Sequence, residues 1–449
     1  MSLITSDQFR IIIGVGQTGL SVARYLARKG VSFAACDTRS SGAAIDRFRQ
    51  EFPNIELRTG ELDVDWLSGA TELVISPGVA KANVAIESAI SRGSRLLGDI
   101  DLFARVVKAP VIAITGSNGK STVTTLVGQM AADAGLNVAV GGNIGVPVLD
   151  LLSQDADLYV LELSSFQLET CSELRPMVAT VLNLSADHMD RYASMLDYHQ
   201  AKHRIYRRAA VAVYNRDDSL SRPLVGKDVK QLGFGLGAPD LGQFGVLRSE
   251  KGAVLARGAQ ALLSVDQLKI RGEHNIANAL AALALGEAVK LPLDSMLQTL
   301  SQFGGLEHRC QWVRDHQGCS WYNDSKGTNI GATLAAIKGL GATLKESQKL
   351  VLIAGGQGKG QRFNELKAPL KQYVRTLILI GEDANAIASA TEHPNTLFAD
   401  TLSQAVDIAV KQSQSGDLVL LSPACASLDM FKNYEDRGEQ FIGLVEALI

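Results

Sequence analysis

The residues best suited to chemistry lie in one short stretch, VIAITGSNGKSTVTTL, between Val111 and Leu126. Glycines let backbone N–H groups approach a phosphate closely, a lysine can reach the terminal phosphates, and a hydroxyl can bind Mg²⁺. The usual pattern has a glycine where Ile114 stands, so this is a shortened variant. Its position between an expected strand and an expected helix favours a nucleoside triphosphate site over an ordinary turn. The residues predicted to form it are Gly116, Ser117, Asn118, Gly119, Lys120, Ser121 and Thr122.

Two further apolar runs, LYVLEL (158–163) and ATVLNL (179–184), deliver polar residues near their ends. Glu162 lies near the end of the first, and His188 follows the second. Because the carboxyl ends of parallel strands share one edge of a sheet, both should converge with Lys120. A buried carboxylate there is costly unless it meets a cation, and beside a phosphate loop that cation is Mg²⁺. The alternatives are a carboxylate bonded to loop amides and a structural histidine.

The stretch from Leu196 to Ala210 has a helical pattern and is rich in basic residues. By spacing alone it is a solvated basic face. Clustered cations also lower the pKa of a lysine such as Lys202, and a neutral lysine amine can react with CO₂. Further along, Asn275 and Asn278 fall on one face of the first turn of a helix expected to end near Val289. Asn143 lies in a glycine turn, GNIG, after an expected strand at 138–142.

The N-terminal region carries a dinucleotide fingerprint. A strand at 10–13 precedes GVGQTG, a helix should run to Ala27, and a second strand at 33–36 ends at Asp37. This pattern is compatible with binding of NAD, with binding of a uridine diphosphate sugar, or with glycines that serve packing only. It does not distinguish the two ligands. The turn Ser76-Pro77-Gly78-Val79 could face the same ligand, and 96–99 reads as a short strand or a linker.

The C-terminal region predicts another α/β unit, with strands at 320–323, 350–354, 376–380 and 418–421. Asp324 and Lys326 follow the first of them and could grip ribose and phosphate, although Asp324 could equally cap a helix. Arg309 could stabilise charge on a transferring phosphoryl group. The segment SPACAS (422–427) is expected to open a helix whose N–H groups suit a carboxylate.

The overall composition restricts the class of protein. The chain has 449 residues, enough for two to four domains, and a net charge of −3, which gives no reason to expect nucleic acid as a partner. Its five cysteines are scattered, which fits reduced thiols in the cytoplasm. We expect neither a signal peptide nor a membrane span, since no apolar run approaches about 18 residues. We therefore expect a cytoplasmic protein.

Several motifs together resemble the Mur ligase family: TGSNGKST, ELSSFQLE, NLSADHMDRY, GEHNIANA, EHRCQ, YNDSKGTN and LSPACASLD. The SSFQLE and DHMDRY versions are most similar to its D-glutamate-adding branch. The resemblance implies ATP-dependent amide formation between UDP-N-acetylmuramoyl-L-alanine and D-glutamate, through an acyl phosphate, in peptidoglycan precursor synthesis. It also implies two Mg²⁺ ions and a carbamylated Lys202, which stands 14 positions after His188 (202 − 188).

The expected architecture is three α/β domains. Residues 1–98 form a Rossmann-like domain for the uridine diphosphate sugar, 99–305 a central P-loop ATPase-like parallel sheet, and 306–449 a C-terminal Rossmann-like domain that closes on ATP and binds the amino acid. A monomer with small-molecule substrates is expected. The open alternatives are a folylpolyglutamate synthetase-like ligase, an NAD-linked oxidoreductase and a nucleotide-switch protein.

The resemblance assigns residues to the catalytic, metal, ATP, uridine diphosphate and D-glutamate sites. The catalytic residues would be Lys120, His188, Lys202, Asn143 and Arg309. The metal ligands would be Ser121, Glu162, His188 and Lys202. ATP would be held by the phosphate loop with Asn275, Asn278, Arg309, Asp324 and Lys326. The uridine diphosphate site would comprise Gly16, Gln17, Thr18, Asp37, Thr38, Arg39, Ser76 and Gly78. D-Glutamate would be held by Thr328, Lys359, Ser427 and Tyr434. Gln357 and Tyr434 depart from the family pattern, which often has an acid and an aromatic without a hydroxyl there.

Overall fold

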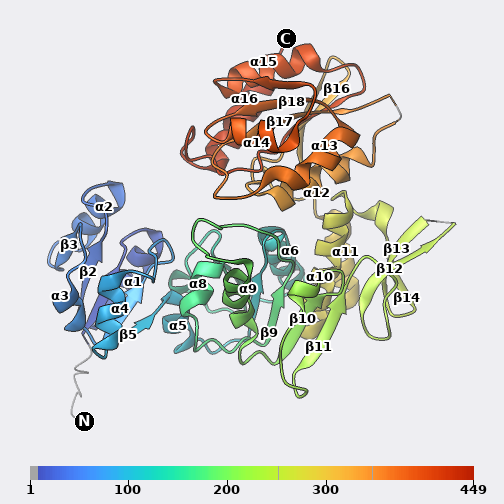
Figure 1. Cartoon of the computed structure of the whole chain (residues 1–449). Helices are drawn as coiled ribbons and strands as arrows, with labels where there is room; N and C mark the ends of the chain where they lie inside the picture. Colours follow the sequence, from blue (N-terminus) through green and yellow to red (C-terminus); the bar gives the residue numbers. More distant parts are fainter. Residues whose placement is uncertain (1–8, 251, 346) are drawn as a thin grey trace.

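The computed structural model describes residues 9–250, 252–345 and 347–449, which build three β-sheets covered by helices (Figure 1). The expectation about a signal peptide concerns residues that mostly lie outside this part of the chain. Among the described residues, no helix is both long and apolar enough to cross a membrane.

The first sheet has five parallel strands in the order β3-β2-β1-β4-β5. Ile11, Ile12 and Ile13 of β1 are fully buried at its centre, as expected for an apolar run in a parallel sheet. The strands are β1 Arg10–Ile13, β2 Phe33–Asp37, β3 Leu57–Thr59, β4 Glu72–Ile75 and β5 Arg95–Leu97. The helices are α1 Gln17–Arg28, α2 Ala43–Glu51, α3 Val64–Ser68 and α4 Val84–Ser91. The segment considered as a strand or a linker is therefore an edge strand.

The central sheet has nine strands in the order β14-β13-β12-β11-β10-β9-β6-β8-β7. The strands are β6 Val111–Thr115, β7 Val138–Gly142, β8 Leu158–Glu162, β9 Val178–Val181, β10 Val211–Asn215, β11 Lys230–Phe234, β12 Phe244–Ser249, β13 Gly252–Arg257 and β14 Gln260–Ser264. From β7 to β12 the neighbours are parallel, whereas β12, β13 and β14 form an antiparallel meander that the sequence reasoning did not anticipate. β9 also ends at Val181, three residues before the expected end.

Helices cover both faces of the central sheet. Residues 279–285 of α10 are all buried, because this alanine- and leucine-rich helix packs on β10, β11 and β12 and also contacts its neighbours α6 and α11. The helices are α5 Asp99–Ala104, α6 Lys120–Asp133, α7 Val148–Leu151, α8 Ser165–Thr170, α9 Met195–His203, the 3₁₀ turn η1 Arg204–Tyr206, α10 Glu273–Ala288 and α11 Leu293–Gln302. The helix expected to reach Ala210 ends at Tyr206, because Arg208 adopts a left-handed φ of 59° before β10 begins.

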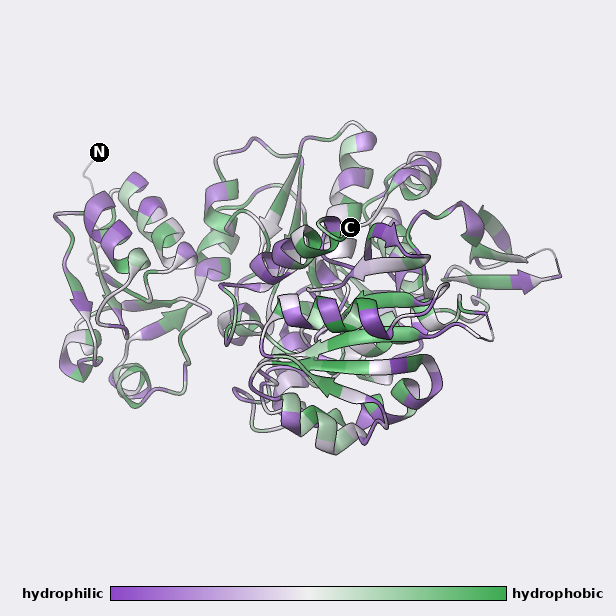
Figure 2. Ribbon diagram, turned by 90° about the horizontal axis from the view of Figure 1, so that it is seen from above, coloured by the Kyte–Doolittle hydropathy of each residue, from purple (hydrophilic) through white to green (hydrophobic). Residues whose placement is uncertain are grey.

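The third sheet has six strands in the order β15-β16-β20-β17-β18-β19. They are β15 Gln311–His316, β16 Cys319–Asn323, β17 Leu350–Gly355, β18 Val374–Ile380, β19 Thr396–Phe398 and β20 Leu418–Leu421. The helices are α12 Ile330–Gly341, α13 Lys367–Tyr373, α14 Ala384–Thr391, α15 Leu402–Gln412 and α16 Tyr434–Glu446. Figure 2 shows its strands as a hydrophobic layer between more polar helical faces.

One expectation about this region was wrong: residues 422–427 do not open a helix. They form a loop in which Ala424 has a left-handed φ of 59° and Ala426 pairs with Gln357, and the next helix, α16, begins only at Tyr434. The pairing with the GGQGKG loop takes the backbone groups that a helix would need, so no helix N-terminus is available there.

The domain of the central sheet contacts the domains of the first and third sheets (Figures 1 and 2). Towards the first sheet, the Arg191 guanidinium donates to the carbonyls of Pro77 (2.8 Å) and Val79 (3.2 Å). Towards the third sheet, Asn329 and Lys359 contact loops at the carboxyl edge of the central strands. The predicted site residues of all three regions therefore face a common edge.

Candidate active site

The phosphate loop joins β6 to α6 and is shaped by two glycines with positive φ. Gly116 has a φ of 153° and Gly119, the N-cap of α6, has a φ of 81°. A Cβ on Gly119 would lie 2.4 Å from Oδ1 of Asn278, so the first turn of α10 approaches the loop closely. Nζ of Lys120 donates to the carbonyls of Gly116 and Ser117, each at 2.9 Å. The predicted contribution of α10 to this site therefore has a geometric basis.

Lys202 is buried directly beneath this loop. Its side chain points from α9 so that Nζ donates to the Gly116 carbonyl at 2.9 Å and to Oγ1 of Thr115 at 3.3 Å. Burial, and then the charge of Lys120, lowers the pKa of Lys202 well below its ordinary value. The interpretation of this segment as a solvated basic face is wrong for Lys202, which is 2% exposed; of the basic residues in the segment, Arg207 and Arg208 are exposed. A lysine with a lowered pKa has a larger neutral fraction, the form that reacts with CO₂.

Glu162 ends β8 with one carboxylate oxygen bonded and the other without a partner. Oε1 accepts a hydrogen bond of 2.7 Å from Nδ2 of Asn143, whereas Oε2 is buried and has no partner among the described residues. An unpaired buried carboxylate oxygen is costly, which makes it a natural ligand for a cation. The loop-amide alternative therefore accounts for only one of its two oxygens.

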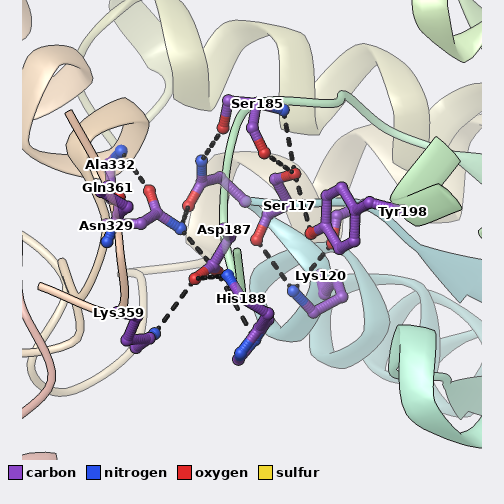
Figure 3. A network of polar contacts seen from close by, with 12 residues as sticks. Ser117, Lys120, Ser185, Asp187, His188, Tyr198, Asn329, Ala332, Lys359 and Gln361 are labelled. Carbon is purple, nitrogen blue, oxygen red and sulfur yellow. Dashed lines mark hydrogen bonds and ion pairs between the residues drawn. The ribbon is translucent and has the colours of Figure 1, made fainter. Parts of the chain in front are cut away.

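His188 follows β9 in the left-handed region, with a φ of 57°. Its ring packs edge-on against Phe166, and its side chain is 33% exposed. Burial lowers the pKa of His188 to about 4, so the imidazole stays neutral at physiological pH and can act as a metal ligand. Its neighbour Asp187 is paired with Nζ of Lys359 at 3.0 Å (Figure 3).

A cavity of about 260 Å³ separates the phosphate loop from the third sheet. Nη2 of Arg309 reaches across to donate to Oγ of Ser121 at 2.8 Å. The predicted nucleotide residues that line the cavity are Asn118, Gly119, Thr122, Asn275, Asn278, Arg309, Asp324 and Lys326. Gly116, Ser117, Lys120 and Ser121 belong to the same loop without lining this cavity.

Asp324 lies at the far wall of this cavity. Burial raises the pKa of Asp324 to about 6, although it accepts a 2.7 Å hydrogen bond from the Ser422 hydroxyl. The interpretation of Asp324 as a helix cap is wrong, because the cap of α12 is Asn329. Nζ of Lys326 sits 3.5 Å from the centre of the Tyr434 ring, and burial lowers the pKa of Lys326 to about 8.

A second cavity, of about 470 Å³, lies at the carboxyl edge of the first sheet. All residues predicted for the uridine diphosphate site line it: Gly16, Gln17, Thr18, Asp37, Thr38, Arg39, Ser76 and Gly78. The central sheet completes its wall with Gly142, Asn143, Gly145 and Gln167. Burial alone would raise the pKa of Asp37, but the Arg39 guanidinium and the Val15 N–H hold it below its usual value. Asn143 contributes to this cavity and also contacts Glu162, so the two sites adjoin.

The residues predicted for the amino acid lie on neighbouring loops of the third sheet. Lys359 belongs to the GGQGKG loop, and Ser427 is buried in the loop that pairs with it through Gln357 and Ala426. Thr328 follows the loop of Asp324, and Tyr434 begins α16. The contacts link Lys359 to Asp187 and Tyr434 to Lys326.

The structure also brings residues into the site that the sequence reasoning did not select. Asp187 directly precedes His188, so its position after a strand could have identified it. Asn183, His274 and Gln167 line the cavities. Asn329 ends the motif YNDSKGTN, but the motif gave no sign of its contacts, because its partners Asn118 and Asp187 are far away in the chain.

Whether a divalent cation fits this site depends on which side-chain oxygen and nitrogen atoms can bind it. The described residues contain no group of three or more His, Cys, Asp and Glu side chains arranged to hold a metal. The unpartnered Oε2 of Glu162 is a donor of the type that a hard cation prefers. The Lys202 amine has no acceptor, so it would need to become a carbamate to act as a ligand.

Comparison with known proteins identifies the class. Three family models match the chain: the Mur ligase MurD-like N-terminal domain (residues 8–98), the Mur ligase middle domain (114–286) and the Mur ligase glutamate ligase domain (308–425). The chain belongs to the Mur ligase family. These matches support the ligase interpretation over an NAD-linked oxidoreductase.

Full-length relatives narrow the class further. The chain is 57% identical to a UDP-N-acetylmuramoylalanine–D-glutamate ligase of Pseudomonas savastanoi pv. phaseolicola, over 100% of both chains. It is 56% identical to the ligase of the same name from Pseudomonas aeruginosa and 52% identical to that from Acinetobacter baylyi, again over 100% of both chains.

Solved structures agree on the fold. A UDP-N-acetylmuramate-alanine ligase of Thermotoga maritima superimposes with a TM-score of 0.61 at 17% identity, covering 98% of this chain and 99% of the other. A pseudomurein peptide ligase type C of Methanothermus fervidus gives a TM-score of 0.61 at 18% identity, with the same coverage. The three-domain α/β architecture is therefore that of the family.

Proposed function

We propose that the protein is an ATP-dependent ligase that joins D-glutamate to UDP-N-acetylmuramoyl-L-alanine in peptidoglycan precursor synthesis. The observation that carries the proposal is a link between the first-sheet cavity and the phosphate-loop region: Asn143 lines that cavity and its Nδ2 also donates to Glu162 at the end of β8. The full-length relatives that bear this activity in their names support the choice of substrates.

We assign the first-sheet domain (1–98) to the uridine diphosphate sugar, residues 99–305 to ATP, and residues 306–449 to nucleotide closure and the amino acid. The first cavity would hold the nucleotide sugar so that its L-alanine carboxylate extends past Asn143 towards Glu162. The open N-terminus of α1, at Gly16, suits a diphosphate.

The phosphate loop would bind the ATP phosphates through its N–H groups, with Lys120 released from the carbonyls of its own loop to face them. A carboxylate oxygen of the sugar substrate attacks the γ-phosphorus and ADP leaves, which gives an acyl phosphate. The amine of D-glutamate then attacks the carbonyl carbon, inorganic phosphate leaves, and the nitrogen loses a proton. Asn143 and Arg309 would steady the oxyanions.

Mg²⁺, when bound, supplies positive charge that screens the carboxylate and phosphates from one another. Ser121 and Glu162 would hold one ion, and His188 with a carbamylated Lys202 would hold a second. For these ligands to act, Arg309 must move from the Ser121 hydroxyl that it contacts here. Lys359, Thr328, Ser427 and Tyr434 would orient D-glutamate. The protein would act as a monomer.

A phosphate-release assay tests the proposal directly. The purified chain, with ATP, Mg²⁺ and UDP-N-acetylmuramoyl-L-alanine, should release phosphate with D-glutamate, and product mass should increase by one glutamyl residue. L-Glutamate, D-alanine and meso-diaminopimelate serve as matched amines and should give little turnover. Equal turnover with L-glutamate, or turnover without the nucleotide sugar, would contradict the proposed substrates.

A further inference from the structure

The first turn of α12 touches two loops of the central domain at once, through the side chain of Asn329. This residue is 3% exposed and caps its own helix, with Oδ1 accepting the Ala332 N–H at 2.9 Å. Its Nδ2 donates to Oδ1 of Asn118 and to Oδ2 of Asp187, each at 3.1 Å (Figure 3). Both amide hydrogens and the oxygen therefore have partners, and the hydrogens are used across a domain boundary.

Asn118 is held from both sides. Its backbone N–H donates to Oδ1 of Asn183 at 2.8 Å, and its carbonyl accepts from Nδ2 of the same residue at 3.0 Å. The central domain thus fixes the backbone of Asn118, whereas its side chain is shared between α12 and Ser185 of the central domain, to whose Oγ its Nδ2 donates at 3.4 Å. Asn118 lines the nucleotide cavity and Asn329 does not. Ala332, Ala335 and Ala336 of α12 line this cavity directly, whereas Asn329 can affect the nucleotide only through the phosphate loop.

Gly331 shows independently how closely α12 approaches that loop. A Cβ at this position would lie 2.7 Å from Oγ of Ser185 and 3.0 Å from Nδ2 of Asn118. Real Cβ atoms do not come as close as 2.7 Å, so a larger residue would displace the Ser185 hydroxyl and the Asn118 amide or move the helix away from the loop. Glycine is unfavourable within a helix, and here the missing side chain is what permits the contact.

We propose that the first turn of α12 couples docking of the C-terminal domain to the shape of the phosphate loop, with Asn329 as the positioning residue and Gly331 as the residue that permits the approach. The same docking brings Asp324, Lys326 and Arg309 to the nucleotide cavity. Binding of nucleotide and docking then reinforce each other, because coupling between two equilibria is reciprocal. The inference rests on the proposed function for its biological meaning.

The Asn329→Ser variant separates the role of Asn329 as the cap of α12 from its contacts with the central domain. Serine caps a helix about as well as asparagine, but it lacks the amide that reaches the two loops. We expect an unchanged melting temperature without ligand, together with a Kd for a non-hydrolysable ATP analogue with Mg²⁺ raised about tenfold by the loss of two hydrogen bonds. The radius of gyration of the analogue-bound variant in small-angle scattering should exceed that of the wild type.

Asn83→Ser is the matched control. Asn83 is also an asparagine N-cap, of α4 in the first-sheet domain, where its Oδ1 accepts the Ala85 N–H at 2.9 Å, two residues along the chain rather than three. It has no part in the contact with α12. This variant should keep wild-type analogue affinity and scattering.

Gly331→Ala tests the close approach of α12 to the phosphate loop, because its effect on helix stability and its effect on docking have opposite signs. Alanine favours the helix, so a purely local effect would stabilise α12, whereas the added Cβ should hinder docking and weaken analogue binding. Gly339→Ala controls for helix propensity in the same helix, because its Cβ would make only an ordinary contact, 3.5 Å from Cε1 of His274. Gly339→Ala should bind the analogue as the wild type does.

Wild-type analogue affinity and scattering in both Asn329→Ser and Gly331→Ala would overturn the coupling. That result is distinct from failure of the proposed function, which would appear as an inactive wild-type protein in the phosphate-release assay. Analogue binding and scattering are measured without turnover, so each hypothesis can fail alone.

Discussion

The molecule uses the same backbone device twice, with different side chains around it. In the first sheet, β1 leads through Gly14, with a φ of 91°, into α1; in the central sheet, β6 leads through Gly116 into α6. Both loops expose a helix N-terminus at the carboxyl edge of a parallel sheet, where anions bind. Up to this point the two loops are equivalent.

Their surroundings differ in charge. The phosphate loop has Lys120 and the buried Lys202 against it and the half-paired Glu162 near it. The first loop has the Asp37–Arg39 pair, with both Arg39 bonds at 2.8 Å, and the uncharged Ser76, whose hydroxyl donates to the Gly14 carbonyl. A strand–glycine–helix unit suits phosphates in both places, and we propose that the buried, unevenly paired charges beside the second loop are what add phosphoryl transfer there.

The largest expected effect is that of Lys120→Ala. Loss of this charge should reduce kcat by at least about 10³-fold, because its ammonium meets charge that develops in the transition state. The folded protein and its binding of UDP in the first cavity should persist. Steady-state kinetics and UDP titration check both statements. Near-normal phosphate release by Lys120→Ala would show that this charge does not distinguish the phosphate loop from the first loop.

Lys202 tests whether a carbamate, rather than charge alone, distinguishes the phosphate loop. Lys202→Ala should lose most activity, and a short carboxylic acid in the medium should partly restore it by supplying oxygen ligands in the vacated space. Lys202→Arg should remain inactive, since a guanidinium keeps the charge but cannot form a carbamate. Full activity of Lys202→Arg would show that charge alone matters.

Gly19→Ala should affect the first loop through packing. A Cβ at Gly19 would lie 2.0 Å from the Gly14 carbonyl oxygen, a backbone atom that cannot yield cheaply. We expect a loss of about 3 kcal/mol in the free energy of unfolding. Gly16→Ala is the control, since a Cβ there meets nothing within 4 Å. Equal melting temperatures for the two variants would contradict the close contact.

Asp37→Asn should have the smallest effect. Asp37 is buried, but Arg39 is 55% exposed and an asparagine oxygen can still accept the Val15 N–H, so losing the charge should cost about 1 kcal/mol, or roughly fivefold in KM for the nucleotide sugar. The KM for ATP should not change, because Asp37 lies outside the nucleotide cavity. A matching rise in the KM for ATP would mean that the two loops do not act separately.

Much of this organisation could be predicted from sequence because it depends on local patterns. The apolar runs at β1, β6 and β8 and the glycine turns after them are contiguous, so the strands and both loops followed directly. Glu162 could be selected because a lone acid in an apolar strand needs a partner.

Other features depend on contacts between distant segments. Nothing local distinguishes Asn329 from an ordinary helix cap, because its role comes from Asn118 and Asp187 in another domain. The loop at 422–427 resembled a helix start until its pairing with Gln357 was known. Spacing made Lys202 a surface residue, and only the packing of α9 under the phosphate loop buries it.

Residues 187–191 form one short segment that contacts both outer domains. At one end Asp187 holds Lys359, and at the other Arg191 donates to the Pro77 and Val79 carbonyls that border the first cavity. The Arg191 N–H donates to the His188 carbonyl at 3.0 Å, which stiffens the turn. A small molecule that displaced Pro77 would therefore disturb the segment that also carries Asp187, the partner of Lys359. Because Pro77 lies outside the nucleotide cavity, such a molecule would not compete with ATP there.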